Sequence, residues 1–564
     1  MRQDDVKICF FNRRVKMNMM KPALLKSMKT YSKEQLVKDL VSGLIVAIIA
    51  LPLSIALALA SGVGPEQGIY TAIVAGFLIS FFGGSKVQIS GPTAAFATIV
   101  AGVVATNGMS GLVVATVMAG IMLILMGLFK LGSLIKFIPY TITTGFTAGI
   151  AVTIFIGQWK DFFGVTYANG ETPIETIEKA EVFFHNIGSL NVQAMVVGLV
   201  CLAVLIVWPR INQKIPGSLI AVIVGIVMVK GLSMNVNTIG DLYTITNKLP
   251  SLQIPAIDMT LIKTVAPDAF TIAILAAIES LLSCVVADSM INDKHDSNME
   301  LVAQGIGNIG SALFGGIPAT GAIARTAANV KSGGRTPVSG IVHAIVLALI
   351  LVVLMPYAAL IPMPTIAAIL FQVAYNMCQW RPFLHLTKTA PKSDIIVLVL
   401  TFFLTVIFDL VVAIEFGMLL AIILFMKRMS DEAEVKEWKY KEYMDNEEDA
   451  KDLLSVPIPV KVFEINGPLF FGVTGQIAEI AVKDHIKCVI IRMRGVPALD
   501  ASAMESITEL YDDCHKKGIT FIFSHVNEQP MKVMKKAGFV KKVGEENFVK
   551  NIHEALKKSR EIVE

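Results

Sequence analysis

Charged residues are scarce in this chain of 564 residues: Asp, Glu, Lys and Arg make up 17% of it, while 54% is hydrophobic. Soluble globular proteins carry about 25% charged residues. Between residues 41 and 159 the charges are limited to Glu66, Lys86, Lys130 and Lys136. That stretch can hold several apolar runs of about 20 residues, the length of a transmembrane helix. The composition excludes a wholly soluble protein and predicts an α-helical polytopic membrane protein.

Cysteine is also rare. The six cysteines show neither close pairing nor metal-ligand spacing, at positions 9, 201, 284, 378, 488 and 514, which argues against a disulfide framework and a zinc site. No two of the histidines stand four residues apart, and we find no glycine-rich nucleotide-binding motif and no basic-aromatic surface for nucleic acid. We therefore expect no metal, no cofactor, no nucleic-acid partner and no enzymatic activity.

The charges that are present divide the chain into four parts. The first 40 residues contain ten Lys or Arg against four Asp or Glu and lack the order of a signal peptide. Residues 1–35 are therefore interpreted as a basic cytosolic lead whose lysines meet anionic lipid. Residues 36–428 form the predicted transmembrane domain, residues 429–454 a charged linker, and residues 455–564 a domain of soluble composition.

The transmembrane domain divides into fourteen apolar segments, at about 36–60, 68–83, 92–107, 110–129, 134–158, 191–208, 216–232, 267–289, 299–314, 319–330, 337–355, 357–375, 393–409 and 411–427. Lysine and arginine fall on alternate connections, as expected for cytosolic loops. The predicted external loop 160–190 has five acidic residues against two lysines. This pattern predicts a multi-pass protein of the cell (inner) membrane with both termini in the cytosol.

A short motif occurs twice in this domain. Phe82-Gly-Gly84 precedes Pro92-Thr-Ala-Ala95, and Phe314-Gly-Gly316 precedes Pro318-Ala-Thr-Gly321. The copies lie about 230 residues apart, with seven segments between them. An odd number of crossings inverts the second copy, so the spacing predicts two seven-segment halves of opposite orientation, a 7+7 inverted repeat.

Each copy predicts a short helix that begins inside the bilayer, at residues 93–104 and 320–330. A proline suits a first helical turn, and the first N–H groups of a helix have no partner within it, so they attract an anion. We therefore predict that an anion lies between the two helix starts. The predicted binding residues are Thr93, Ala94, Ala95, Thr320, Gly321, Ala322 and Ala324. The alternative is that Gly-Pro only kinks a packed helix.

Two ionisable residues lie in apolar surroundings. Glu279 is the only charge between residues 269 and 287, and a carboxylate in a membrane span is costly unless it is paired, hydrated or protonated. Ser283 lies one turn further on the same face. Arg325 would add a positive charge beside the second helix start. We predict ion coupling at Glu279 and Ser283 and anion binding at Arg325; the alternative is a structural ion pair between Glu279 and Arg325. His295 and His343 are expected at the membrane interfaces.

Six runs carry a family resemblance: Gly91-Pro-Thr-Ala-Ala-Phe96, Ala277-Ile-Glu-Ser-Leu-Leu-Ser283, Val286-Ala-Asp-Ser289, His295-Asp-Ser-Asn298, Phe314-Gly-Gly-Ile-Pro-Ala-Thr-Gly-Ala-Ile-Ala-Arg-Thr326 and Ser332-Gly-Gly-Arg-Thr-Pro337. They closely resemble the SulP sulfate permease family of anion transporters. The resemblance implies fourteen segments in core and gate domains, alternating access, and substrate between the third and tenth segments. It implies ion coupling at Glu279, anion attraction at Arg325, and a homodimer.

The chain departs from the family pattern in its first segment. Many members have Gln and Tyr facing the anion where this chain has Leu53 and Leu57. Members that resemble sodium-coupled bicarbonate carriers have Asp at position 279 and no Arg at position 325. A fixed guanidinium repels Na⁺, so we expect co-transport of H⁺ through Glu279 rather than of Na⁺.

The soluble part alternates predicted strands, at 460–465, 488–493 and 520–524, with predicted helices, at 474–485, 502–517 and 529–537. This order indicates a small α/β domain. The run Leu499-Asp-Ala-Ser-Ala-Met504 resembles the loop of STAS domains, and the resemblance implies regulatory phosphorylation at Ser502 and a cytosolic partner. The alternative is that Asp500 and Ser502 only cap the following helix.

The sequence thus predicts a secondary active transporter that moves a small inorganic anion of the sulfate class, or a dicarboxylate, by alternating access. Three alternatives of the same architecture stay open: a sodium-coupled bicarbonate transporter, an anion channel or motor, and a membrane sensor that signals through the soluble domain. A nucleobase carrier is less compatible, because such sites use a second acid where this chain has Arg325.

Overall fold

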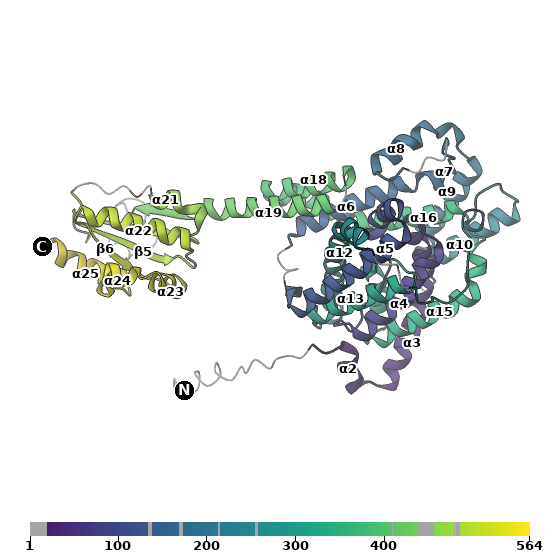
Figure 1. The fold of residues 1–564 in the computed structure, drawn as a ribbon, viewed down its shortest axis with the longest axis horizontal. Helices are drawn as coiled ribbons and strands as arrows, with labels where there is room; N and C mark the ends of the chain where they lie inside the picture. Colours follow the sequence, from purple (N-terminus) through teal and green to yellow (C-terminus); the bar gives the residue numbers. More distant parts are fainter. Residues whose placement is uncertain are drawn as a thin grey trace. The chain divides into compact units, whose positions relative to one another are not determined.

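The computed structural model describes residues 20–133, 138–168, 173–212, 215–253, 258–408, 410–437, 456–478, 480 and 485–564. The chain has two compact units, Met1–Met418 and Leu419–Glu564. The first is helical and the second contains a five-stranded sheet, as the helices and strands of Figure 1 show.

Helices occupy all fourteen predicted segments. Their bounds are α3 (Lys33–Ala60), α4 (Pro65–Phe82), α5 (Ala97–Leu128), α6 (Tyr140–Gly157), α9 (Val192–Ile211), α10 (Gly217–Gly231), α12 (Met259–Ile291), α13 (Ser297–Leu313), α14 (Ile323–Lys331), α15 (Val338–Ala358), α16 (Met363–Cys378), α18 (Lys392–Ile407) and α19 (Leu410–Asp431). The third and fourth segments both lie in α5, where Gly108 has a φ of 65° and kinks the helix. Residues 134–137 of the fifth segment lie outside the described residues.

Six helical stretches of the described residues are long and apolar enough to cross a membrane: Lys33–Ala60, Ala94–Leu128, Tyr140–Phe163, Val192–Ile211, Met259–Ile291 and Val338–Ala358. Others are shorter, such as α14 with 9 residues. A straight helix of that length extends about 14 Å, less than half of the hydrocarbon core.

Short helices are also present outside the predicted segments, in the N-terminal lead and in several connections. They are α2 (Ala23–Ser27), α7 (Trp159–Phe163), α8 (Thr176–His185), α11 (Ile239–Leu242) and α17 (Trp380–Thr389). A capping box at Glu175 and Glu178 starts α8. The basic lead is also partly folded, because the N–H of Ala23 donates to the carbonyl of Gly83 at 2.8 Å.

The helices of the first unit pack mainly within two groups. The first helix group comprises α3, α4, α5, α12, α13, α14 and α15, and the second comprises α6, α7, α9, α10, α16 and α18. The groups meet where α3 contacts α10 and α16, and where the short 3₁₀ helix η2 (Ala94–Phe96) contacts α6. This division is the kind that separate core and gate domains require.

Within the first helix group, α5 and α13 approach closely at paired glycines. A Cβ atom on Gly120 would lie 2.7 Å from the carbonyl oxygen of Gly305, and one on Gly305 would lie 2.4 Å from that of Gly120. Small residues of this kind let membrane helices pack backbone to backbone.

The second unit is an α/β domain whose sheet has the order β3-β4-β5-β6-β7. Its strands are β3 (Glu434–Glu437), β4 (Val460–Asn466), β5 (Cys488–Gly495), β6 (Thr520–Ser524) and β7 (Phe548–Val549). Only β3 runs antiparallel to its neighbour. The helices are α21 (Thr474–Ala478), α22 (Ala501–Lys516), α23 (Glu528–Lys536), α24 (Phe539–Val543) and α25 (Ile552–Val563).

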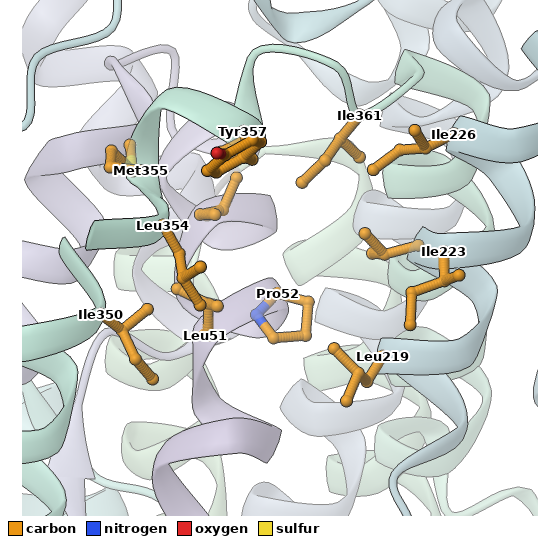
Figure 2. A pocket seen from close by; sticks show the side chains of 13 residues that line it. Leu51, Pro52, Leu219, Ile223, Ile226, Ile350, Leu354, Met355, Tyr357 and Ile361 are labelled. Atoms are coloured by element: carbon orange, nitrogen blue, oxygen red, sulfur yellow. The ribbon is translucent and has the colours of Figure 1, made fainter. Parts of the chain in front are cut away.

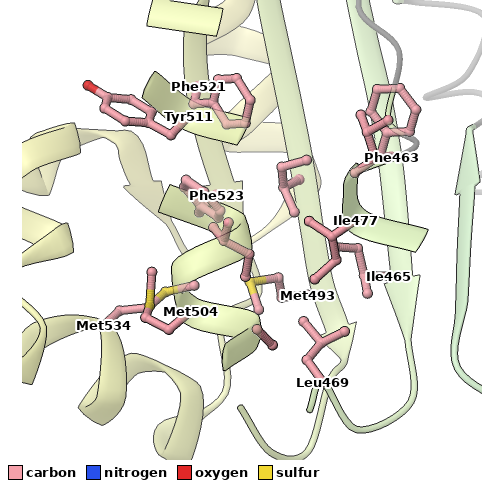
Figure 3. Packing of buried hydrophobic residues seen from close by; sticks show 14 of the residues in the cluster. Phe463, Ile465, Leu469, Ile477, Met493, Met504, Tyr511, Phe521, Phe523 and Met534 are labelled. Atoms are coloured by element: carbon pink, nitrogen blue, oxygen red, sulfur yellow. The ribbon is translucent and has the colours of Figure 1, made fainter. Parts of the chain in front are cut away.

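Both faces of this sheet are buried, which explains its apolar strands. Phe463, Ile491 and Phe523 pack on one face with Met504 of α22 (Figure 3). On the other face, the strand residues Val462, Ile490 and Ile522 pack with Leu556 of α25.

The predicted strands and the helices predicted at 502–517 and 529–537 are present. The helix predicted at 474–485 ends at Ala478, and residues 479 and 481–484 lie outside the described residues. The predicted linker is wrong in part. Residues 434–437 form β3, which pairs with β4 from Glu434↔Asn466 to Glu437↔Phe463. The charged composition concealed this strand, because an edge strand with half-exposed residues has no apolar run. Residues 438–455 lie outside the described residues.

We predict that Gly120→Ala destabilises the transmembrane unit by about 1–3 kcal/mol, because the added methyl group overpacks the contact between α5 and α13. The melting temperature of the purified protein in detergent measures the effect. Gly102→Ala in the same helix is the matched control, since a Cβ there meets nothing within 4 Å. Equal melting temperatures for the two variants would contradict the prediction.

Candidate anion-binding site

The two predicted helix starts meet in the structure. Strands β1 (Ser90–Gly91) and β2 (Thr320–Gly321) form an antiparallel pair with the register Ser90↔Gly321 and Gly91↔Thr320. Each strand directly precedes a helix start, and the pairing satisfies backbone groups that would otherwise be costly at membrane depth. Segments about 230 residues apart in the sequence are thereby joined at one crossing.

The first helix start follows β1. Thr93 has extended backbone and precedes η2, which continues into α5. In the described part of the chain, no group accepts a hydrogen bond from the backbone N–H of Ala94 or Ala95. Both residues are buried, at 6% and 3% exposure. These two N–H groups therefore have no acceptor within the described residues, and their predicted part in anion binding stays a prediction.

The second helix start differs from the prediction. Thr320 and Gly321 lie in β2, and α14 begins at Ile323. The hydroxyl of Thr320 donates to the carbonyl of Ala276 at 3.0 Å, and the N–H of Ala322 donates to the carbonyl of Ile89 at 2.9 Å. Pairing with β1 keeps this backbone extended, which a single-sequence pattern does not reveal.

Free donors are nevertheless present there. Among the described residues, the N–H groups of Ile323 and Ala324 have no hydrogen-bond partner. Both side chains are exposed, and Ile323 is 42% exposed. The start of α14 therefore faces open space, and Ile323 is a candidate that the sequence analysis missed.

Glu279 of α12 lies at the first helix start. The hydroxyl of Thr93 donates to Oε2 of Glu279 at 2.9 Å. Both side chains are only partly buried, whereas Ile278 and Ser280 on either side of Glu279 are buried. The carboxylate and the hydroxyl therefore line an accessible part of the fold rather than a closed core.

Arg325 of α14 lies on the other side of the crossing. Its Nη2 donates to the carbonyl of Pro92, and its Nη1 is buried without a hydrogen-bond partner. A Cβ on Gly91 would lie 2.6 Å from Nη1, so a larger residue at this position would force the guanidinium to shift. Glu279 and Arg325 are both described, and no ion pair joins them. The structure therefore does not support the ion-pair alternative.

Ser283 does not share the Glu279 contact. Its Oγ lies 3.5 Å from Oγ1 of Thr326 in α14, and the side chain is fully buried. The residue thus joins α12 to α14, one turn away from the carboxylate. Its predicted part in ion coupling stays a prediction.

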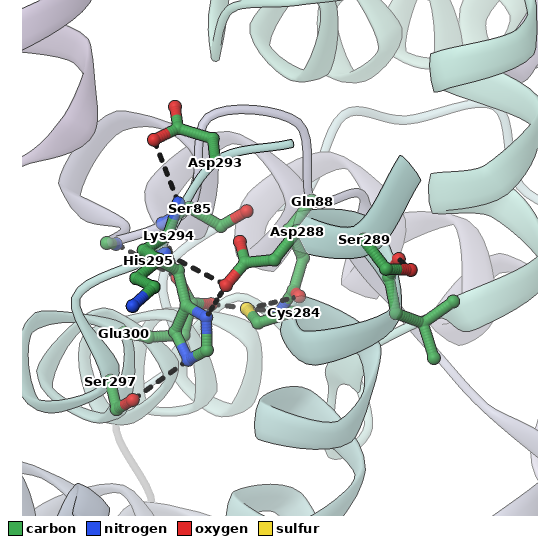
Figure 4. Close-up of polar contacts among 12 residues, drawn as sticks. Ser85, Gln88, Cys284, Asp288, Ser289, Asp293, Lys294, His295, Ser297 and Glu300 are labelled. Atoms are coloured by element: carbon green, nitrogen blue, oxygen red, sulfur yellow. Dashed lines mark hydrogen bonds and ion pairs between the residues drawn. The ribbon is translucent and has the colours of Figure 1, made fainter. Parts of the chain in front are cut away.

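A buried polar network behind the crossing was missed. Glu300 of α13 accepts hydrogen bonds from the N–H groups of Gly84 and Ser85 at 2.9 and 3.1 Å, and from Gln88 and Gln304 at 2.9 and 3.0 Å. Figure 4 shows Glu300 among these contacts, with Gln88 beside Cys284. The hydroxyl of Ser280 is a fifth donor, at 3.3 Å. These five donors in fixed positions indicate a structural carboxylate, since a buried charge needs such compensation.

This network reaches both strands of the crossing. Gln304 donates to the hydroxyl of Ser90 at 3.3 Å, and the side chain of Asn308 bonds both the carbonyl and the N–H of Ala319 at 2.8 Å. Glu300, Gln304 and Asn308 stand four residues apart, and all are 0% exposed. A polar stripe at this helical spacing in an apolar segment was the signal that could have revealed it.

The two histidines differ in position. His295 lies in the connection between α12 and α13, where its Nδ1 is 2.8 Å from Asp288, as Figure 4 shows. His343 is fully buried in α15, with no partner for either ring nitrogen. His343 lies near the start of α15, and its predicted position at a membrane interface stays a prediction. Its Nδ1 would be 3.8 Å from a Cβ on Gly76, a residue that itself lies against β1.

An apolar cavity lies elsewhere in the transmembrane unit. It has a volume of about 240 Å³ and is lined by side chains of α3, α10 and α15, including Pro52, Ile223 and Leu354 (Figure 2). It contains no charged side chain and none of the residues at the crossing. A dry hydrocarbon surface offers nothing to an anion, so we do not assign this cavity to the substrate.

In the second unit, Ser502 is exposed at the second position of α22. Asp500 caps that helix, because its side chain accepts from the N–H of Ala503 at 2.9 Å. It also accepts from the N–H of Phe471 at 3.0 Å. Capping therefore explains Asp500 but not Ser502. In the described residues no group of three or more His, Cys, Asp or Glu could hold a metal ion.

Comparison with known proteins assigns the family. The model described as "Sulfate permease family" matches residues 36–401, and the STAS domain model matches residues 455–555. The chain belongs to the sulfate permease family. It is accordingly a multi-pass membrane protein and an anion transporter of this family, with a soluble STAS domain at its C-terminal end.

Two relatives match over nearly the whole chain. "Putative sulfate transporter YvdB" of Bacillus subtilis is 39% identical over 533 residues, covering 92% of this chain and 97% of that protein. "Bicarbonate transporter BicA" of a Picosynechococcus species is 30% identical over 544 residues, covering 92% and 94%. The relatives therefore include proteins named for two different anions.

Solved structures share the fold. The transmembrane domain of a cyanobacterial BicA aligns with a TM-score of 0.61 at 30% identity, covering 70% of this chain and 98% of that one. The murine Solute Carrier 26 family member A9 anion transporter, in its inward-facing state, aligns with a TM-score of 0.86 at 17% identity, covering 99% and 98%. The second likeness shows the fold alone.

We predict that Asp500→Ala loosens the start of α22, because it removes the acceptor of two backbone N–H groups. Loss of a cap costs about 1 kcal/mol, so amide exchange in the first turn should accelerate roughly fivefold. Hydrogen–deuterium exchange of the full-length protein measures this. Ser502→Ala is the control and should leave exchange unchanged. Faster exchange in Ser502→Ala but not in Asp500→Ala would show that Ser502, and not Asp500, caps the helix.

Proposed function

We propose that the chain is a secondary active transporter of a small inorganic anion of the sulfate class, or of a dicarboxylate, driven by H⁺ through Glu279. The observation that carries this proposal is the β1–β2 crossing, which brings free N–H donors of two helix starts together with Glu279 and Arg325. It argues against the Gly-Pro kink, because a kinked packed helix would leave no free donors.

The charges at the crossing favour an anion. Helix N-termini carry a partial positive charge, and Arg325 adds a full one beside Gly91. Ionised Glu279 at the first helix start opposes that attraction. A proton on Glu279 removes the repulsion, so binding of the proton and of the anion favour each other by linkage. The same fixed guanidinium disfavours Na⁺.

The arrangement of helices supports alternating access. The crossing belongs to the first helix group, and η2 contacts α6 of the second. A site at the seam between two separately packed groups becomes accessible from either side when one group moves against the other. We further propose a homodimer in the cell membrane with both termini in the cytosol, as the alternation of basic loops indicates.

The STAS domain supports a regulatory role at Ser502. The serine is exposed in the first turn of α22, where a phosphate would be favoured by the helix N-terminus but repelled by the neighbouring Asp500. A phosphate on Ser502 would therefore compete with the Asp500 carboxylate for the N–H groups at the start of α22. The resulting change at this surface would alter the binding of a cytosolic partner.

A sodium-coupled bicarbonate transporter is the second candidate, favoured by the 30% identity to BicA. Uptake of labelled sulfate, bicarbonate and succinate into proteoliposomes, each with a proton or a sodium gradient, separates the candidates. A carrier saturates and shows counterflow, whereas a channel does neither. Negligible uptake of every anion would instead favour the sensor.

We predict that Glu279→Gln abolishes the stimulation of anion uptake by an inward proton gradient and leaves counterflow measurable, because the amide cannot gain or lose the coupled proton. Gradient-driven uptake and counterflow in proteoliposomes measure the two activities.

Asp293→Asn is the matched control for this variant. The hydrogen bond and charge of Lys86 lower the pKa of Asp293, which lies in the loop after the same helix and stays ionised. Asp293→Asn should therefore keep the stimulation of anion uptake by an inward proton gradient. Full stimulation in Glu279→Gln would reject Glu279 as the coupling residue.

We predict that Arg325→Ala raises the KM for the anion roughly tenfold or more, because it removes a buried charged donor beside the helix starts. Initial rates of uptake at varied anion concentration provide the measurement. Lys331→Ala, at the exposed end of the same helix, should leave KM unaltered. An unchanged KM in Arg325→Ala would exclude the guanidinium from the site.

A further inference from the structure

Thr93 forms the only described contact between the Glu279 carboxylate and the helix starts. A threonine hydroxyl has one hydrogen to donate and can accept on its oxygen, whereas an ionised carboxylate can only accept. The 2.9 Å contact between Oγ1 of Thr93 and Oε2 of Glu279 therefore has one possible direction while Glu279 is charged. The single hydrogen of Thr93 then points at Glu279 and away from any anion.

Protonation of Glu279 permits the reverse direction. The carboxylic acid O–H can donate to Oγ1 of Thr93 at the same distance, and the Thr93 hydrogen is released to rotate toward another acceptor. No bond other than hydrogen bonds changes, and the proton on Glu279 is the one taken up. The released donor adds to the free N–H groups of Ala94 and Ala95, which follow Thr93 directly.

We propose that Thr93 is the positioning residue that couples the proton to the anion: its hydroxyl donates to ionised Glu279 and turns to the anion when Glu279 is protonated. This inference rests on the proposed proton-coupled function and gives that function a specific hydrogen-bond switch. Partial exposure of both side chains gives proton and anion access to the pair.

The surrounding charges do not provide another direct link. Arg325 on α14 is bound to the carbonyl of Pro92 and forms no ion pair with Glu279. On α13, Glu300 is held by its own donors behind β1, and α5 carries no charged residue. His343 on α15 lies beside Gly76, and Asp288 on α12 bonds His295. None of these groups contacts Glu279, whose hydrogen-bond partner within the described residues is Thr93.

The test is the pH dependence of KM in proteoliposome counterflow, with labelled sulfate as the probe, or with succinate or bicarbonate where the panel identifies that anion. The wild-type KM should fall as the pH falls. Thr93→Val, which keeps the shape but loses the hydroxyl, should raise KM at low pH roughly tenfold or more and flatten the profile. Thr93→Ser should restore the pH dependence.

Two further variants separate the proposals. Glu279→Gln should give a low, flat KM, because the amide is uncharged at every pH and its N–H can donate to Thr93. Adding Thr93→Val to it should raise KM again. Thr98→Val makes the same exchange in the first turn of α5 and should keep the wild-type profile. It is the control for the effect of replacing a threonine by valine away from the contact with Glu279.

The outcomes are distinct. A wild-type KM that does not depend on pH overturns both the proton coupling and the switch. A pH-dependent wild type with an equally pH-dependent Thr93→Val overturns the switch and leaves the coupling at Glu279 standing. A flat profile in Thr93→Ser also overturns the switch, because the serine retains the hydroxyl.

Discussion

The antiparallel pairing of Ser90–Gly91 with Thr320–Gly321 is the interaction on which the transmembrane unit depends. Interrupted backbone inside a membrane is tolerated only where its polar groups are satisfied by protein, water or ligand. Each strand supplies hydrogen-bond partners for backbone groups of the other strand. The backbone N–H groups that this pairing leaves without a partner lie at the two helix starts. The free donors are therefore a direct consequence of the way the two strands satisfy each other.

The buried network of α13 supports that crossing from behind. Glu300, Gln304 and Asn308 are fully buried polar side chains that reach the backbone before β1, the hydroxyl of Ser90 and the backbone of Ala319. Satisfied polar networks in a low-dielectric interior are rigid, because breaking any bond leaves an unpaired group. The protein thus has two carboxylates near the crossing with different surroundings: Glu300 has many fixed donors, whereas Glu279 has a single hydroxyl. This contrast is why Glu279 is available for a coupled change of protonation.

The site also shows how one hydroxyl can connect two ligands. Arg325 and the helix starts provide a constant attraction for an anion, and a constant attraction cannot link transport to a proton. Coupling requires an interaction with the anion that changes with protonation, and in the proposal both the charge of Glu279 and the hydrogen bonding of Thr93 do so. Thr93 lies between the carboxylate and the free N–H groups, so its single donor cannot serve both at once. The STAS domain is built on a different principle, a sheet buried on both faces, and its exposed Ser502 is the part open to regulation.

The sequence by itself determined the membrane class, the fourteen segments and the soluble domain, and it made Glu279, Arg325 and the Gly-Pro run candidates for the site, because hydrophobic length, isolated charge and proline are local properties. Tertiary structure alone decided that Thr320 and Gly321 are a strand, that Ile323 begins the helix, that Glu279 bonds Thr93 instead of Arg325, and that residues 434–437 complete a sheet. Each of these features depends on a contact with a residue far away in the chain, and the local sequence around a residue does not identify such a distant partner.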